Sequence, residues 1–194
     1  MKLKDIVQIA VLTVIGFAIG MAVSMFTGTL GTISLYASAG FAAFVVGPVF
    51  VIMAKRVRKK GAAFLFWIVY GLLYAAMGYW IMIPICLISA ILSELIAGDY
   101  SSNTKVGIAF TVGMFIVAMH PIIFVKILGV EGIVKFAASI GREQAEWMAN
   151  FYTTKNILIA VASNIVLEFL AGKFGIYINN KFFEKRTDGA ILKW

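Results

Sequence analysis

Three ionisable side chains interrupt apolar stretches of the sequence: Glu94, His120 and Glu168. Ionisable groups at membrane depth cost free energy and are functional suspects by default. His120 is the only histidine and precedes Pro121, which leaves a backbone carbonyl one turn back without its N–H partner. Two interpretations stay open for His120. It is a neutral side chain hydrogen-bonded to a neighbouring helix at a kink, or it contacts a substrate, as an axial ligand if that substrate carries a metal.

The two carboxylates have structural interpretations as well. Placing Glu168 near a helix centre costs about 2–3 kcal/mol, so we expect it to face other helices or to reach toward Lys173. Glu94 stands near the inner end of its apolar stretch, where it would cap a helix or form a pair. Asn164 precedes Glu168 by one turn and suits an interhelical hydrogen bond. An intramembrane enzyme would require His120 to meet one of these carboxylates.

Motifs of common enzyme classes are missing. The sequence has no G-x-x-x-x-G-K-[ST] for ATP, no H-E-x-x-H for zinc and no G-x-S-x-G nucleophile elbow. Cys86 is the only cysteine, so ligands for a metalloenzyme are scarce. We therefore expect a binding or transport protein, not an enzyme, with no metal site and no intrinsic cofactor.

The elements that must position these residues are membrane helices. The 194 residues are 62% hydrophobic and 13% charged, far more apolar than a soluble domain. Six apolar runs predict an all-α membrane protein, because a helix satisfies its own backbone hydrogen bonds in lipid. We expect one transmembrane domain over 1–194 with spans at about 6–26, 35–54, 62–79, 82–97, 106–128 and 156–177.

Positive charge predicts the orientation of these spans. Five cations follow the second span directly: Lys55, Arg56, Arg58, Lys59 and Lys60. Short loops rich in Lys and Arg stay in the cytoplasm. With both termini inside, 13 of the 17 Lys and Arg residues are cytoplasmic, including a tail with Lys181, Lys185, Arg186 and Lys193. This pattern explains the net charge of +8 without nucleic acid and predicts a multi-pass protein of the inner (cytoplasmic) membrane.

The outer connections are expected to differ in length. Residues 27–34 read as a Gly- and Thr-rich loop, and residues 78–81 as a tight turn. The long segment 129–154 places Ile133, Phe136, Ala137 and Ile140 at helical spacing, which predicts an amphipathic helix on the outer surface. Its aromatic residues, Trp147 and Tyr152, are either interface anchors or the lid of a pocket.

Several segments resemble the Trep_Strep family of bacterial integral membrane proteins. The resemblance rests on SAGFAAFVVGPVFVIMAKRV at 38–57, GAAFLF at 61–66, MGYWIMI at 77–83 and ISAILSELI at 88–96. That family is grouped with the substrate-binding S components of energy-coupling factor (ECF) transporters, a branch of ABC importers. The resemblance implies a six-helix S component that binds a micronutrient at the outer face. It further implies a transmembrane coupling subunit and two cytoplasmic ATPases as partners.

The resemblance also implies where partners and substrate bind. S components dock through an A-x-x-x-A motif on the first helix. Here Ala10 would be the first alanine of the motif, but Val14 stands four residues later in place of the second alanine. The small residues expected to contribute to docking are Ala10, Gly16, Ala18, Gly20 and Ala22. By analogy the substrate pocket lies in the outer half, closed by 27–34 and 129–154. The residues expected to line it are His120, Asn164, Tyr79, Trp80, Trp147 and Tyr152.

The expected substrate is a vitamin, a vitamin precursor or a haem-like tetrapyrrole held by His120. A stand-alone small permease is the other transport hypothesis, and uptake without any ATPase would favour it.

Overall fold

The computed structural model describes residues 1–137 and 139–183, and this part of the chain is helical. The elements are α1 (Leu3–Gly28), α2 (Thr32–Val57), α3 (Ala62–Ala76), α4 (Met82–Ala97), α5 (Asn103–Ala118), α6 (His120–Ile123), the π-helix η1 (Phe124–Leu128), α7 (Gly129–Phe136), α8 (Arg142–Phe151) and α9 (Thr154–Phe182). The cations Lys185, Arg186 and Lys193 of the expected tail lie outside the described residues.

Four helical segments are long and apolar enough to cross a membrane: α1, α2, α9 and the run from α5 to α7. The helices α3 and α4 are apolar but have only 15 and 16 residues. At about 1.5 Å per residue they extend about 22–24 Å, less than the ~30 Å hydrocarbon core. All six expected apolar runs are helical in the structure. The third helix, α3, ends at Ala76, three residues before the predicted end at residue 79.

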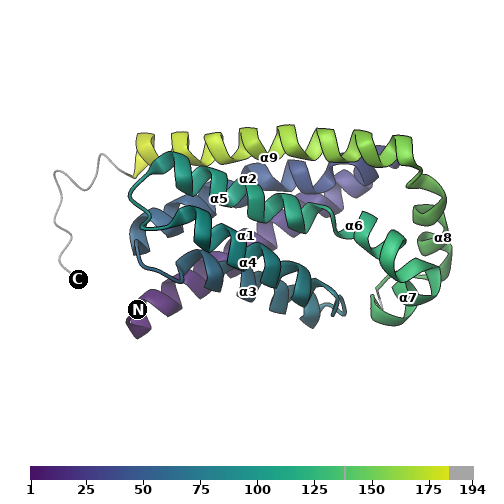
Figure 1. The fold of residues 1–194 in the computed structure, drawn as a ribbon, viewed down its shortest axis with the longest axis horizontal. Coiled ribbons are helices and arrows are strands. Elements are labelled where there is room, and N and C mark those ends of the chain that lie inside the picture. Colours follow the sequence, from purple (N-terminus) through teal and green to yellow (C-terminus); the bar gives the residue numbers. More distant parts are fainter. Residues whose placement is uncertain (138, 184–194) are drawn as a thin grey trace.

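Small residues bring α9 close to two other helices, α2 and α5 (Figure 1). A Cβ atom at Gly175 would lie 2.8 Å from the carbonyl oxygen of Gly47 on α2. A Cβ at Gly172 would likewise lie 2.8 Å from the carbonyl oxygen of Gly107 on α5. Close approach through small residues is a usual way in which membrane helices associate.

The basic connections lie together at one end of the bundle, near the N-terminus and the end of α9 (Figure 1). Lys59, after α2, forms an ion pair of 3.1 Å with Asp5 at the start of α1. Asn103, at the start of α5, donates a hydrogen bond of 3.0 Å to Asn180 near the end of α9. We call this end the basic end.

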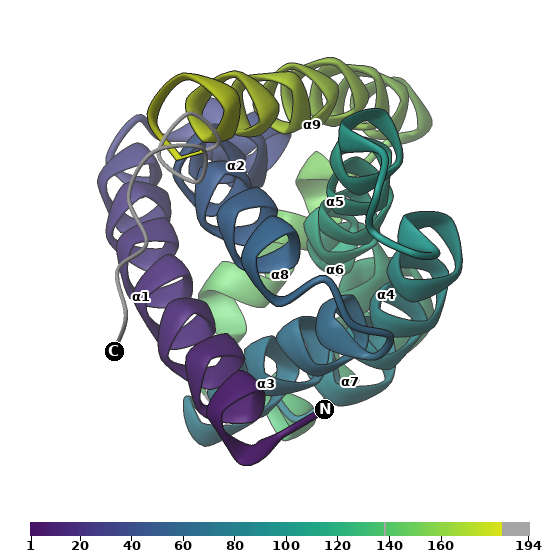
Figure 2. The same cartoon turned by 90° about the vertical axis from the view of Figure 1, so that its left-hand side faces the viewer.

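The opposite end is covered by α7 and α8, which lie behind the bundle when it is viewed from the basic end (Figure 2). The prediction of one amphipathic helix was incomplete, because α7 ends at Phe136 and α8 begins at Arg142. Ala137 leaves the helical conformation and forms an isolated antiparallel β-bridge with Tyr79. This pairing with the α3–α4 turn explains the interruption.

The expected loop at 27–34 is mostly helical. The helix α1 continues to Gly28 and α2 begins at Thr32, so only Thr29–Gly31 connects them. Gly31 has a φ of +62°, a left-handed conformation that glycine adopts readily. A connection of three residues thus joins the two helices, with glycine at its one left-handed position.

Candidate ligand cavity

A cavity of about 320 Å³ lies at the end opposite the basic end. On α1 it is lined by residues between Gly20 and Gly28, toward the end of that helix, and on α2 by residues between Ser34 and Ala42, toward its start. Both stretches lie at the ends of α1 and α2 that are distant from the basic end. The last turns of α3 and α5, together with α6 and α8, complete the wall.

The lining carries no Lys, Arg, Asp or Glu among the residues that the structure describes. Its side chains are mainly thioethers, phenols and hydroxyls: Met21, Met25, Met114, Met148, Tyr70, Tyr74, Tyr79, Ser24, Ser34 and Ser38. Gln144 and His120 add an amide and an imidazole. Apolar walls with a few polar groups are typical of small-molecule sites, and methionine adapts to irregular ligand shapes.

His120 is oriented by the backbone defect that Pro121 creates. Proline has no N–H to donate to the carbonyl of Val117, four residues earlier. The ring Nδ1 of His120 lies 2.8 Å from this carbonyl oxygen. Because a carbonyl oxygen only accepts, Nδ1 must carry the proton, and in the neutral ring Nε2 then presents a lone pair. Within the described residues Nε2 has no hydrogen-bond partner, so it is the imidazole nitrogen available to a ligand.

Aromatic contacts hold the tyrosines of α3 in place. The ring of Phe17 on α1 packs edge-on against Tyr70 and Tyr74, with ring centroids 4.9 and 5.0 Å apart. Tyr74 continues the cluster to Tyr79 at 6.1 Å and to His120 at 6.1 Å. Edge-on pairs of this kind stabilise a fixed geometry beyond the burial of area. The aromatic wall of the cavity is therefore preorganised.

Residues 129–137 and 139–152, which we call the cap, lie over the cavity and line it through Ile140, Gln144 and Met148. On one side the Ser139 hydroxyl donates a hydrogen bond of 2.7 Å to the carbonyl of Met77, beside the bridge between Tyr79 and Ala137. On the other side the Tyr152 hydroxyl donates a hydrogen bond of 2.8 Å to the carbonyl of Leu35 on α2. Burial raises the pKa of Tyr152 above its ordinary value, so this hydroxyl remains a donor at any physiological pH.

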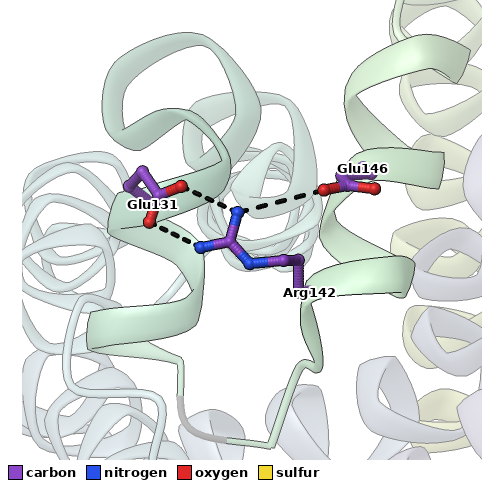
Figure 3. A network of polar contacts seen from close by, with 3 residues as sticks. All are labelled: Glu131, Arg142 and Glu146. Carbon is purple, nitrogen blue, oxygen red and sulfur yellow. Dashed lines mark hydrogen bonds and ion pairs between the residues drawn. The ribbon is translucent and has the colours of Figure 1, made fainter.

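An ion pair joins the two helices of the cap (Figure 3). The guanidinium of Arg142 on α8 donates two hydrogen bonds, of 2.7 and 2.8 Å, to the carboxylate of Glu131 on α7. Glu146 approaches the same guanidinium to 3.9 Å. A bidentate pair of this kind holds a defined geometry, although solvent exposure limits its energy.

The structure places the six predicted pocket residues in different surroundings. His120 and Tyr79 line the cavity, and Tyr152 is a buried anchor of the cap. Trp80 and Trp147 lie on the surface with 63% and 44% of their area exposed. Asn164 is buried on α9, where its amide nitrogen donates to the carbonyls of Tyr36 and Ala160.

Much of the lining comes from α1 and α2, where only the segment 27–34 was predicted from the sequence; this segment contributes Gly28 and Ser34. Ser24, Ser34 and Ser38 are the features that distinguish this part of the wall. Their spacing within apolar segments was the available signal, although serine is also a common packing residue between membrane helices.

Glu94 and Glu168 lie away from His120. The carboxylate of Glu94 caps the start of α3 near the basic end, accepting hydrogen bonds from the backbone N–H groups of Gly61 at 2.6 Å and Phe64 at 3.2 Å. This confirms the capping interpretation. Glu168 faces the bundle interior and is fully buried. This confirms the first of the two expectations for Glu168, that it faces other helices; Lys173, the alternative partner, lies over the Phe169 ring at 4.6 Å.

The small residues of α1 divide between two faces. Gly16 and Gly20 are buried, and a Cβ there would lie 3.2 Å from Val49 and 2.8 Å from Val46, both on α2. By contrast, Ala18 and Ala22 are exposed and Ala10 is partly exposed. The glycines therefore serve packing within the bundle.

Comparison with known proteins identifies the family. A family profile described as hypothetical bacterial integral membrane protein (Trep_Strep) matches residues 3–185. No significant match is found among curated proteins or among solved structures. The matched segment spans nearly the whole sequence, and the helices described above are those of a protein with multiple membrane spans. The chain thus belongs to the Trep_Strep family of bacterial integral membrane proteins.

Proposed function

We propose that this protein is the substrate-binding S component of an ECF-type ABC importer, crossing the membrane six times with both termini in the cytoplasm. The observation that carries the proposal is the position of the cavity, at the end opposite the basic end. Cation-rich connections remain in the cytoplasm. The cavity therefore opens toward the outer half of the membrane, where a capture subunit meets its substrate.

The size of the cavity favours a vitamin or a vitamin precursor. Its volume of about 320 Å³ is at the lower limit of the ~300–1,000 Å³ typical of small-molecule sites. Its tyrosines and methionines suit a flat ligand with few charges. A haem-like tetrapyrrole, with Nε2 of His120 as axial ligand, is a larger alternative that would require movement of the cap.

The same proposal assigns the partners. The sequence carries no Walker motif, so ATP hydrolysis must come from other chains, here two cytoplasmic ATPases joined through a transmembrane coupling subunit. On α1 the face with Ala18 and Ala22 is exposed and available to the coupling subunit. Gly16 and Gly20 are not available, because α2 covers them.

Affinity purification from the native membrane tests the partners. The tagged protein is solubilised in a mild detergent, and co-purifying proteins are identified by mass spectrometry. We expect a coupling subunit and two ATPases in defined ratio to the tagged chain. Uptake by liposomes that contain the purified chain alone would overturn the proposal and establish a stand-alone permease.

Absorbance of the same preparation tests the tetrapyrrole alternative. A bound haem gives a Soret band, which His120→Ala should abolish because the ring supplies the available Nε2. A Soret band that persists in His120→Ala would exclude His120 as the ligand. Absence of the band leaves vitamins and their precursors as the substrate class.

A further inference from the structure

Three buried oxygen atoms lie without hydrogen-bond partners on the inward face of α9. They are Oδ1 of Asn164 and both carboxylate oxygens of Glu168, within the residues that the structure describes. Asn164 is 4% exposed and Glu168 is 0% exposed. Buried acceptors without a partner are rare in folded proteins, so each requires an explanation. Glu168 occupies the middle of α9, far from either end of the helix.

The amide of Asn164 has one consistent orientation. Its Nδ2 donates hydrogen bonds of 2.8 Å to the carbonyl oxygens of Tyr36 and Ala160. The reverse orientation would place Oδ1 against two carbonyl oxygens, which is repulsive. Oδ1 therefore remains an acceptor. Since residues four apart are neighbours on a helix face, Oδ1 and the Glu168 carboxyl group share one face.

Among the residues that the structure describes, no cation forms an ion pair or hydrogen bond with this group of acceptors. The two helices that pack against α9 carry no ionisable side chain in the stretches 40–51 and 106–118. The Tyr36 hydroxyl donates its hydrogen bond to Asn156 Oδ1, at 2.8 Å, and so does not serve these acceptors. The cations on these three helices are Lys55, Arg56, Lys105, Lys155, Lys173 and Lys181. Lys173 is the nearest to Glu168 in sequence, five residues further on, and its ammonium lies over the Phe169 ring at 4.6 Å.

The packing around α9 favours the smallest cation. A Cβ at Gly40 would lie 3.2 Å from Asn164 Oδ1, and one at Gly47 would lie 2.9 Å from the Ala171 carbonyl oxygen. Helices in such close contact leave little space for a metal ion with its several oxygen ligands. A proton requires no additional space. It also converts one acceptor oxygen of Glu168 into a donor.

We propose that Glu168 and Asn164 form a proton-binding site within the membrane segment, in which the protonated Glu168 carboxyl donates a hydrogen bond to Asn164 Oδ1. One proton enters from water and leaves to water, so the site alternates between a neutral acid and a carboxylate. The neutral form allows α9 to pack against α2 and α5. This site is separate from the proposed capture of substrate and links the packing of α9 to pH.

The stability of the bundle then depends on pH with a definite sign. The folded protein keeps a proton at Glu168 that the unfolded chain gives up in neutral solution, where a free Glu is ionised. A state that binds more protons loses stability as pH rises. For one proton the folding equilibrium constant falls up to tenfold per pH unit. Glu168→Gln should remove this component, because the Gln amide donates to Asn164 Oδ1 at any pH.

Infrared spectroscopy of the purified protein in lipid nanodiscs tests the site directly. At neutral pH the wild type should show the carbonyl stretch of a protonated, buried carboxylic acid. This band should disappear in Glu168→Gln and persist in Glu143→Gln, which makes the same chemical change at an exposed position on α8. If Glu168→Gln does not fold, Glu168→Asp should shift the band.

Thermal unfolding supplies the second test. Between mildly acidic and neutral pH the apparent Tm of the wild type and of Glu143→Gln should fall more steeply than that of Glu168→Gln. Two results would overturn the proposal. One is a wild-type spectrum with Glu168 ionised at neutral pH. The other is a Tm that rises when sodium replaces choline at constant ionic strength and pH, which would indicate a metal cation in place of the proton.

Discussion

Replacing Gly175 by alanine should separate α9 from α2 and destabilise the bundle. A Cβ at Gly175 would lie 2.8 Å from the carbonyl oxygen of Gly47 and 2.9 Å from Val51 Cγ2, whereas ordinary contacts begin near 3.4 Å. The backbone oxygen cannot rotate away, so the helices must move apart by several tenths of an ångström. Overpacking of this kind costs about 1–3 kcal/mol. The better helix propensity of alanine returns about 0.5–1 kcal/mol, so the middle of the two ranges leaves a net loss of about 1 kcal/mol.

Thermal unfolding in one detergent measures this loss. A net change of about 1 kcal/mol corresponds to a decrease in Tm of about 2–4 °C for a chain of this size. Gly28→Ala is the matched control, because no other heavy atom lies within 4 Å of a Cβ at that position. We expect Gly28→Ala to be as stable as the wild type. Equal Tm values for Gly175→Ala and the wild type would refute the close contact between α2 and α9.

Three further predictions concern the cap. Tyr152→Phe should lower stability by about 0.5–1.5 kcal/mol, the usual value of one hydrogen bond, as measured by denaturant unfolding; no change would exclude the hydrogen bond to α2. The double variant Tyr79→Cys/Ala137→Cys should form a disulfide, because bridged antiparallel residues have suitable Cα separations. Oxidation should then block ligand exchange and reduction restore it, and unchanged exchange would show that the cap need not open. Arg142 holds the pKa of Glu131 below its ordinary value, so this pair stabilises the cap near neutrality and loses its effect as pH falls through that lowered value. Proteolysis of the cap should therefore accelerate in acid for the wild type, but change less with pH in Glu131→Gln.

The helices and the grouping of basic connections were predictable because membrane insertion depends on local composition. Apolar runs become helices in lipid, and cations sort to one side. The cluster from Lys55 to Lys60 accordingly lies at the basic end. The capping role of Glu94 was also predictable, because a carboxylate near the end of an apolar run requires hydrogen-bond donors, which the start of a helix provides.

The form of the cap was less predictable, because it depends on contacts between distant residues. The amphipathic pattern continues through Ala137, but its bridge to Tyr79 on the α3–α4 turn ends the helix. The cavity wall was hidden for a similar reason. Serines and methionines of α1 and α2 carry little chemistry individually and line a site only once the helices pack. His120 was recognisable because a lone imidazole beside a proline is unusual at membrane depth.

The central claim is that the cavity opposite the basic end captures a small molecule. Mass spectrometry of small molecules released from the protein, purified from its native membrane, tests this claim most directly. Ser38→Phe should fill the cavity, and Val166→Phe places the same ring on the exposed face of α9 as a control. We predict one compound bound to the wild type and to Val166→Phe, but lost from Ser38→Phe. Equal amounts in all three proteins, or no specific compound in any, would contradict the account.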